Sequence, residues 1–96
     1  MSGAHHWTFL SNHAHVLICL AAQSDARLRD VAERVGITER AVQRIVAELV
    51  ADHYVVIKKI GRRNSYVLDG SLHLRHPVEA HCTVDALIAL ILKGTS

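Results

Sequence analysis

The sequence predicts a mainly α-helical domain with one small β-hairpin, in the order α-α-α-β-β-α. Apolar side chains recur at helical spacing in two neighbouring segments, a glycine separates these segments, and two β-branched runs around a second glycine follow them. The chain has 96 residues, of which 50% are hydrophobic and 21% are charged, as expected for one small globular domain. We divide it into an N-terminal arm (1–10), a folded domain (11–75) and a C-terminal segment (76–96) that holds a dimerisation helix.

The first two helices are predicted from their apolar stripes. Ser11 can cap a helix over residues 12–23, whose apolar side chains form one broad face. A polar break then precedes a second, shorter helix over residues 28–35. Its stripe repeats at i, i+3, i+4 and i+7 and consists of Leu28, Val31, Ala32 and Val35.

A tight turn joins the second helix to a third. Gly36 ends the second helix without a Cβ clash, and Thr38 is a good N-cap for a helix that reaches about residue 52. The core stripe of this third helix is Val42, Ile45, Val46 and Leu49. Its opposite, outward stripe is Arg40, Gln43, Arg44 and Ala47, again at i, i+3, i+4 and i+7.

The residues after the third helix change to a β pattern. The runs YVVIKK (54–59) and NSYVL (64–68) predict two strands of a hairpin, and the four residues between them include Arg62 and Arg63. Residues 71–82 follow no clear period. We therefore expect a hairpin with a doubly basic tip, followed by a segment that the pattern does not assign.

The last predicted helix covers residues 84–92, with Thr83 as its N-cap. Residues 86–92 are apolar on every side, and so small a domain cannot cover such a helix alone. A second copy of the chain is the natural cover. The residues that we assign to this homodimer contact are Trp7, Phe9, Leu87, Ile88 and Ile91.

Positive charge is concentrated in the middle of the chain. The net charge is only +2, but residues 27–63 hold nine of the 11 Lys and Arg residues against five acidic ones. This segment is a candidate surface for a polyanion, although a charged stretch alone is also typical of a solvated face. The outward stripe favours the first interpretation, because arginine can pair with guanine edges and glutamine with adenine edges in a major groove.

The stretch LRDVAERVGITERAVQRIVAELVADHYVVIKKIGRRNSYVL (28–68) resembles the winged helix-turn-helix of MarR-like transcription regulators. The resemblance implies a homodimer that binds double-stranded DNA, with the third helix in the major groove and the hairpin wing on the backbone or minor groove. The residues that it places at the groove or the wing tip are Thr38, Glu39, Arg40, Gln43, Arg44, Arg62 and Arg63. The chain is shorter than larger members, which leaves little room between subunits for an effector pocket.

Two other functions remain open. Winged helices also serve as protein-interaction modules that bind no DNA. The eight histidines also suggest a metal-responsive repressor resembling the ArsR type, whose best ligand cluster would be His73, His76, His81 and Cys82. No Cys-x-x-Cys pair supports that cluster, so we expect neither a metal nor another cofactor.

The sequence lacks the motifs of several other classes of protein. It has no phosphate-binding glycine-rich loop and no nucleophile elbow, so we do not expect an enzyme. Its longest apolar run is far shorter than the roughly 20 residues of a membrane span, and its N-terminal residues lack the basic stretch and apolar core of a signal sequence, so we expect neither. With only two cysteines, a disulfide framework is not expected either. We therefore expect a cytoplasmic protein without a membrane partner.

Overall fold

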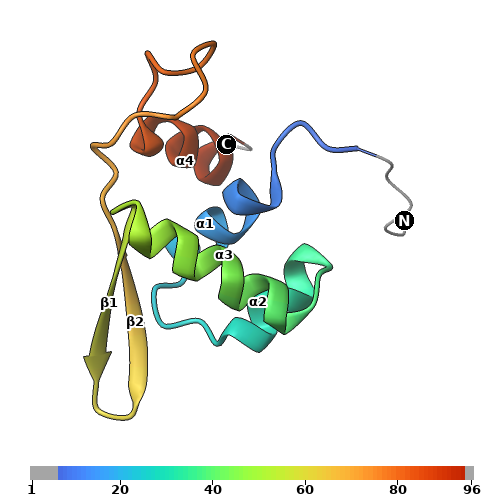
Figure 1. The fold of residues 1–96 in the computed structure, drawn as a ribbon, viewed down its shortest axis with the longest axis vertical. Helices are drawn as coiled ribbons and strands as arrows, with labels where there is room; N and C mark the ends of the chain where they lie inside the picture. The colour runs from blue at the N-terminus through green and yellow to red at the C-terminus, as the bar shows by residue number, and fades with distance from the viewer. Residues whose placement is uncertain (1–6, 95–96) are drawn as a thin grey trace.

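The computed structural model describes residues 7–94, which form four helices and one antiparallel hairpin (Figure 1). The elements are α1 (Asn12–Ala22), α2 (Leu28–Val35), α3 (Glu39–Ala51), β1 (Val55–Ile60), β2 (Arg63–Leu68) and α4 (Val84–Lys93). This order confirms the predicted α-α-α-β-β-α fold class. Among the described residues, no helix is long and apolar enough to cross a membrane.

Three helices begin at the hydroxyl side chains that the sequence indicated. Ser11, Thr38 and Thr83 each accept a hydrogen bond from the amide three residues along, at 3.3, 3.0 and 3.2 Å respectively. These bonds satisfy backbone donors that the first turn of a helix leaves unpaired. The starts of α1, α3 and α4 therefore follow from local side-chain chemistry.

The turn between α2 and α3 depends on the conformation of Gly36. Its φ is +85°, in the left-handed region, and its N–H donates to the carbonyl of Ala32 at 2.8 Å. A Cβ at this position would meet no atom within 4 Å. The turn therefore requires glycine for its backbone conformation and not for lack of space.

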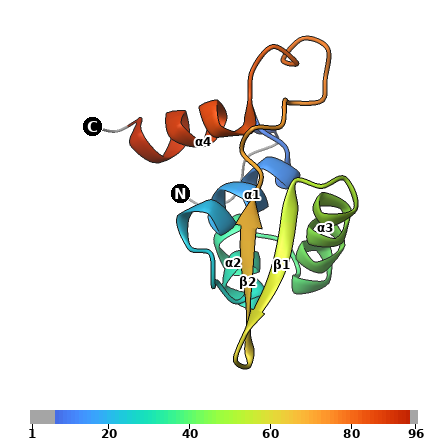
Figure 2. The same ribbon diagram turned by 90° about the vertical axis from the view of Figure 1, so that its left-hand side faces the viewer.

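The core is shared by all parts of the domain. Its largest fully buried side chains are Leu20, Val16, Val31, Val42, Val55 and Val84. They come from α1, α2, α3, the start of β1 and the start of α4. Among the described helices and strands, α4 packs against α1 alone, and in both views it lies at the end of the molecule opposite the wing tip (Figures 1 and 2).

The wing has a shorter turn than the sequence predicted. Pairing runs from Val55 opposite Leu68 to Ile60 opposite Arg63, so only Gly61 and Arg62 connect the strands. Gly61 adopts φ +63°, which allows a tight two-residue connection. We expected Arg63 in the tip, but the structure places it in β2.

The segment that the pattern did not assign crosses the C-terminal end of α3. Tyr54 donates its hydroxyl to the carbonyl of His73 at 2.8 Å, and Arg75 forms an ion pair with Asp52 at 2.6 Å. A backbone bridge between His73 and Thr83 closes the loop. These contacts bring the start of α4 back to the core, and none of them has a periodic signal in the sequence.

Candidate DNA-binding surface

The outward stripe of α3 is exposed along its length. Arg40, Gln43, Arg44 and Ala47 are all exposed, whereas the opposite stripe of the helix is buried in the core. The helix lies at the front of Figure 1 and at the right-hand edge of Figure 2, where no other element covers it. The structure thus presents two guanidinium groups and one amide on a single open helix face.

The first two candidates of α3 lie at its N-terminal end. The Thr38 hydroxyl already accepts from the amide of Ala41 at 3.0 Å, so its first role is to cap the helix. Glu39 is exposed in the first turn, where a carboxylate is favoured by the helix dipole. Both side chains have a structural explanation besides any contact with DNA.

Arg44 is attached only loosely to its own helix. One of its guanidinium nitrogens lies 3.7 Å from Glu48 Oε2, and its side chain is 64% exposed. The other Glu48 oxygen, Oε1, accepts a hydrogen bond from His13 Nε2 at 2.6 Å. This bond from His13 is the main reason that the pKa of Glu48 is below its ordinary value. An exposed ion pair contributes little, so Arg44 can leave Glu48 at small cost.

The two arginines of the wing have different surroundings. Arg62 lies in the two-residue turn and is exposed. Arg63 reaches from β2 to the body of the domain, where its guanidinium donates to the carbonyl of Asp25 at 3.0 Å. Lys58 and Lys59 on β1 are also exposed. We did not single out these lysines, although their place in a strand next to the tip was a signal for them.

The five residues assigned to dimerisation fall into two groups. Trp7 and Phe9 are 69% and 92% exposed, and their rings meet edge to face with centroids 5.0 Å apart. On α4, Leu87 and Ile88 are half-buried, and Ile88 packs against the core of its own domain. Ile91 is exposed, as are its neighbours Leu90 and Leu92, which we had not named individually.

Among the described residues, the histidine and cysteine side chains do not gather into a ligand set. Within residues 7–94, no group of three His, Cys, Asp or Glu side chains is placed to hold a metal ion. The imidazole Nδ1 of His73 lies 2.8 Å from the carbonyl of Ala80, and Nδ1 of His76 accepts from the amide of Val78 at 3.1 Å. Both rings help to shape the loop before α4.

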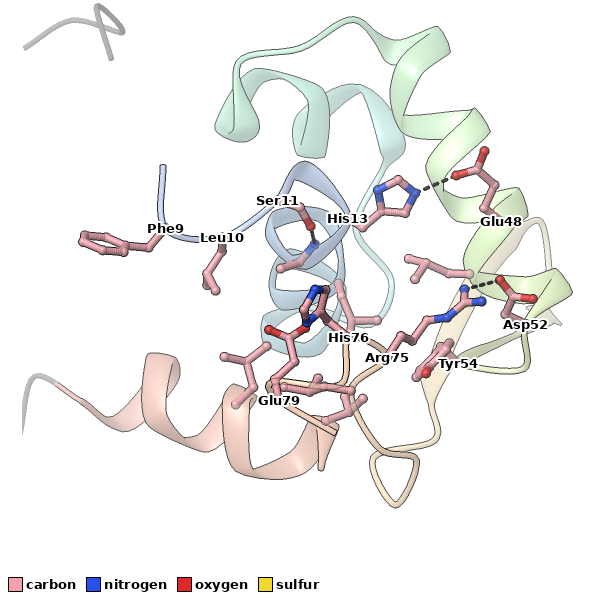
Figure 3. A pocket seen from close by; sticks show the side chains of 16 residues that line it. Phe9, Leu10, Ser11, His13, Glu48, Asp52, Tyr54, Arg75, His76 and Glu79 are labelled. Carbon is pink, nitrogen blue, oxygen red and sulfur yellow. Dashed lines mark hydrogen bonds and ion pairs between the residues drawn. The ribbon is translucent and has the colours of Figure 1, made fainter. Parts of the chain in front are cut away.

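An open groove of about 770 Å³ lies on the body of the domain (Figure 3). Its walls are the start of α1, the C-terminal half of α3, the loop over residues 74–79 and the first turn of α4. The pairs His13–Glu48 and Arg75–Asp52 line it, the latter with 2.6 Å between nitrogen and oxygen. The sequence gave no indication of this groove, because the loop that forms one wall has no periodic pattern.

Comparison with known proteins supports the fold. Residues 12–56 match a family model described as "Winged helix-turn-helix DNA-binding". Among solved structures, the chain is similar to T. potens IscR, with a TM-score of 0.60 and 18% sequence identity; the match covers 98% of this chain and 92% of that chain. At this identity the likeness is one of fold alone. A search of curated proteins finds no match.

Proposed function

We propose that the chain, whose residues 12–56 match the winged helix-turn-helix DNA-binding family model, is a sequence-specific transcription regulator of MarR-like type. In this proposal α3 enters the major groove of double-stranded DNA, and the wing contacts the backbone or the minor groove. The observation that carries it is the exposed stripe Arg40, Gln43 and Arg44, opposite the buried stripe of the same helix. The protein acts by binding and not by catalysis.

The proposal divides the contacts between base edges and phosphates. Arg40, Gln43 and Arg44 read bases, because two forked guanidinium groups and an amide can each bond two atoms of a base edge. Arg62, together with the exposed lysines of β1, neutralises phosphates and supplies affinity that does not depend on sequence. Arg63 contributes mainly by holding the wing in place through Asp25.

We propose that the protein acts as a homodimer. Leu90, Ile91 and Leu92 on α4 are 67%, 41% and 44% exposed, and Trp7 and Phe9 add aromatic surface. Because α4 lies opposite the wing tip, a contact through it would leave α3 and the wing free (Figure 2). A two-fold dimer would then place two recognition helices about 34 Å apart on one face of a pseudo-palindromic site.

One observation favours the alternative of a protein-interaction module. Val56 and Val67 face each other across the two strands of the wing and are 52% and 42% exposed. An exposed apolar pair has no partner on a DNA backbone and is typical of a protein contact. An ArsR-like metal response is favoured by no comparable observation in residues 7–94.

Selection of the purified protein against random duplexes, followed by fluorescence anisotropy at several salt concentrations, decides between the two functions. We expect an enriched sequence whose affinity falls with salt. Replacing Arg44 by Ala should weaken the free energy of binding to the enriched sequence by about 1–3 kcal/mol and should weaken binding to a scrambled duplex much less. Replacing Arg62 by Ala should weaken both duplexes equally and reduce the log-log salt slope by about 0.9. Binding that is feeble, salt-insensitive and without sequence enrichment would instead support the protein-interaction module.

A further inference from the structure

We propose that the groove in Figure 3 binds a small amphipathic organic cation. The ammonium or guanidinium group of such a ligand would lie among the carboxylates of the groove, and its apolar body would cover the leucine floor. The existence of this site does not depend on the proposed function. Its effect on DNA binding, described below, rests on that function.

The size and the floor of the groove fit a small organic molecule. About 770 Å³ lies within the range of roughly 300–1,000 Å³ that is typical of ligand pockets. Four leucines line the groove and form what we call its floor: Leu17 and Leu49 are buried core residues, and Leu74 and Leu87 are half-buried. Tyr54 adds an aromatic ring whose hydroxyl is engaged by the carbonyl of His73, so the ring is held in position.

Carboxylates outnumber fixed positive charges among the lining residues. Arg75 neutralises Asp52 at 2.6 Å, which leaves Glu48 and Glu79. The Nδ1 atom of His76 accepts a hydrogen bond from the amide of Val78, so this atom donates to neither carboxylate. A cation is thus attracted to the groove and an anion is repelled.

Glu79 is the best contact for the cationic group. It lines the groove from the loop that also carries His76, and its carboxylate makes no side-chain hydrogen bond or ion pair within the described residues (Figure 3). The hydrogen bond from His13 lowers the pKa of Glu48, which favours the ionised form of this carboxylate. The groove therefore offers one unpaired carboxylate and one shared carboxylate near neutral pH.

Glu48 also connects the groove to the proposed DNA-binding face. Its Oε1 meets His13 inside the groove, and its Oε2 lies 3.7 Å from Arg44 on the outward stripe of α3. A bound cation competes with Arg44 for this carboxylate and reduces negative charge beside the DNA. Both effects tighten DNA binding, and by linkage DNA must tighten cation binding by the same factor.

The binding step is tested with three probes that share one apolar body: 4-phenylbutylamine as the cation, 4-phenylbutanol and 4-phenylbutyrate. Titrations of the full chain are followed by shifts of the leucine methyl resonances at constant ionic strength. We expect the amine to bind about three- to tenfold more tightly than the alcohol and the butyrate to bind least. Shifts should concentrate at Leu17 and Leu74. Equal affinity for all three probes, tighter binding of the butyrate, or an absence of shifts in these leucines would overturn the proposal.

Two variants distinguish a direct contact between Glu79 and the amine from a general effect of the negative charge of the protein. Glu79→Gln should reduce the affinity of the amine to that of the alcohol and leave the alcohol unchanged. Glu33→Gln removes an exposed carboxylate from α2 outside the groove and should change neither affinity. If both variants weaken the amine equally, the site is refuted. Glu48→Gln gives an independent test if Glu79→Gln does not fold, with a smaller loss of amine affinity expected.

The coupling step is tested by titrating DNA with and without saturating amine. We expect DNA affinity to rise about two- to fivefold, and we expect Glu48→Gln to abolish the increase. Amine binding without any change in DNA affinity would refute the coupling. A protein that binds the amine but no DNA at all would leave the groove site standing and refute the proposed function.

Discussion

The wing is held to the body of the domain by Arg63, and this contact gives a prediction that needs no DNA. Its guanidinium donates to the carbonyl of Asp25 at 3.0 Å, from an exposed side chain to a neutral acceptor. A hydrogen bond of this kind contributes about 0.5–1.5 kcal/mol net, and exposure places it in the lower part of that range. Replacing Arg63 by Ala should therefore lower the free energy of unfolding by about 0.5–1 kcal/mol, which corresponds to a melting temperature lower by about 2–8 °C in a domain of this size.

The matched control for this change is Arg62→Ala, at the preceding residue, which lies in the turn of the wing. Because Arg62 is exposed and has no hydrogen-bond acceptor in the described part of the chain, its loss should change stability by less than about 0.5 kcal/mol. Thermal unfolding followed by circular dichroism measures both. The reasoning fails if the two variants melt together, or if Arg62→Ala is the less stable protein.

Three further predictions concern other parts of the molecule. In chemical denaturation, Gly36→Ala should lower the free energy of unfolding by about 1–2 kcal/mol, and His53→Gly should raise it by about 0.5–1 kcal/mol. The reason is that both positions have a positive φ and only the first has glycine. Changes of the same sign in the two variants would contradict this prediction. In analytical ultracentrifugation, Leu90→Glu should convert the dimer into a folded monomer, whereas Val78→Glu, at a still more exposed position on a loop, should leave the dimer intact. The folded state lowers the pKa of Glu48, so its ionised carboxylate stabilises the protein at pH values above the unfolded pKa near 4.5. The free energy of unfolding of wild type should therefore exceed that of Glu48→Gln above this pH, and the difference should disappear as the pH falls below it. A difference that does not depend on pH would refute this prediction.

Elements with a local chemical signal were predictable from the sequence. The caps Ser11, Thr38 and Thr83 each lie at the predicted helix start, because a side-chain acceptor three residues before a free amide is sufficient to fix that end. The wing turn was predicted too long. Strand periodicity weakens at Ile60 and Arg63, and the pairing of these two residues depends on the left-handed φ of Gly61, which composition alone does not reveal.

Features that depend on contacts between distant segments were not predictable. The outward stripe of α3 could be identified because exposure on a helix follows from spacing. In contrast, His13 and Glu48 are 35 residues apart, and no pattern relates them. Their contact arises because α1 packs across α3 and brings the first turn of one helix to the last turns of the other.

That contact changes how the recognition face is understood. Helical spacing pairs Arg44 with Glu48 at i and i+4, which alone indicates an arginine partly withdrawn from DNA by its own helix. The structure adds a competitor for the same carboxylate, since His13 holds the other oxygen at a distance 1.1 Å shorter than that to Arg44. Because a carboxylate satisfied by one donor attracts a second donor less, the contact with α1 leaves Arg44 freer than its spacing implies. The readiness of α3 to engage DNA is therefore set partly by α1, which lies on the other side of the helix from the proposed DNA-binding stripe.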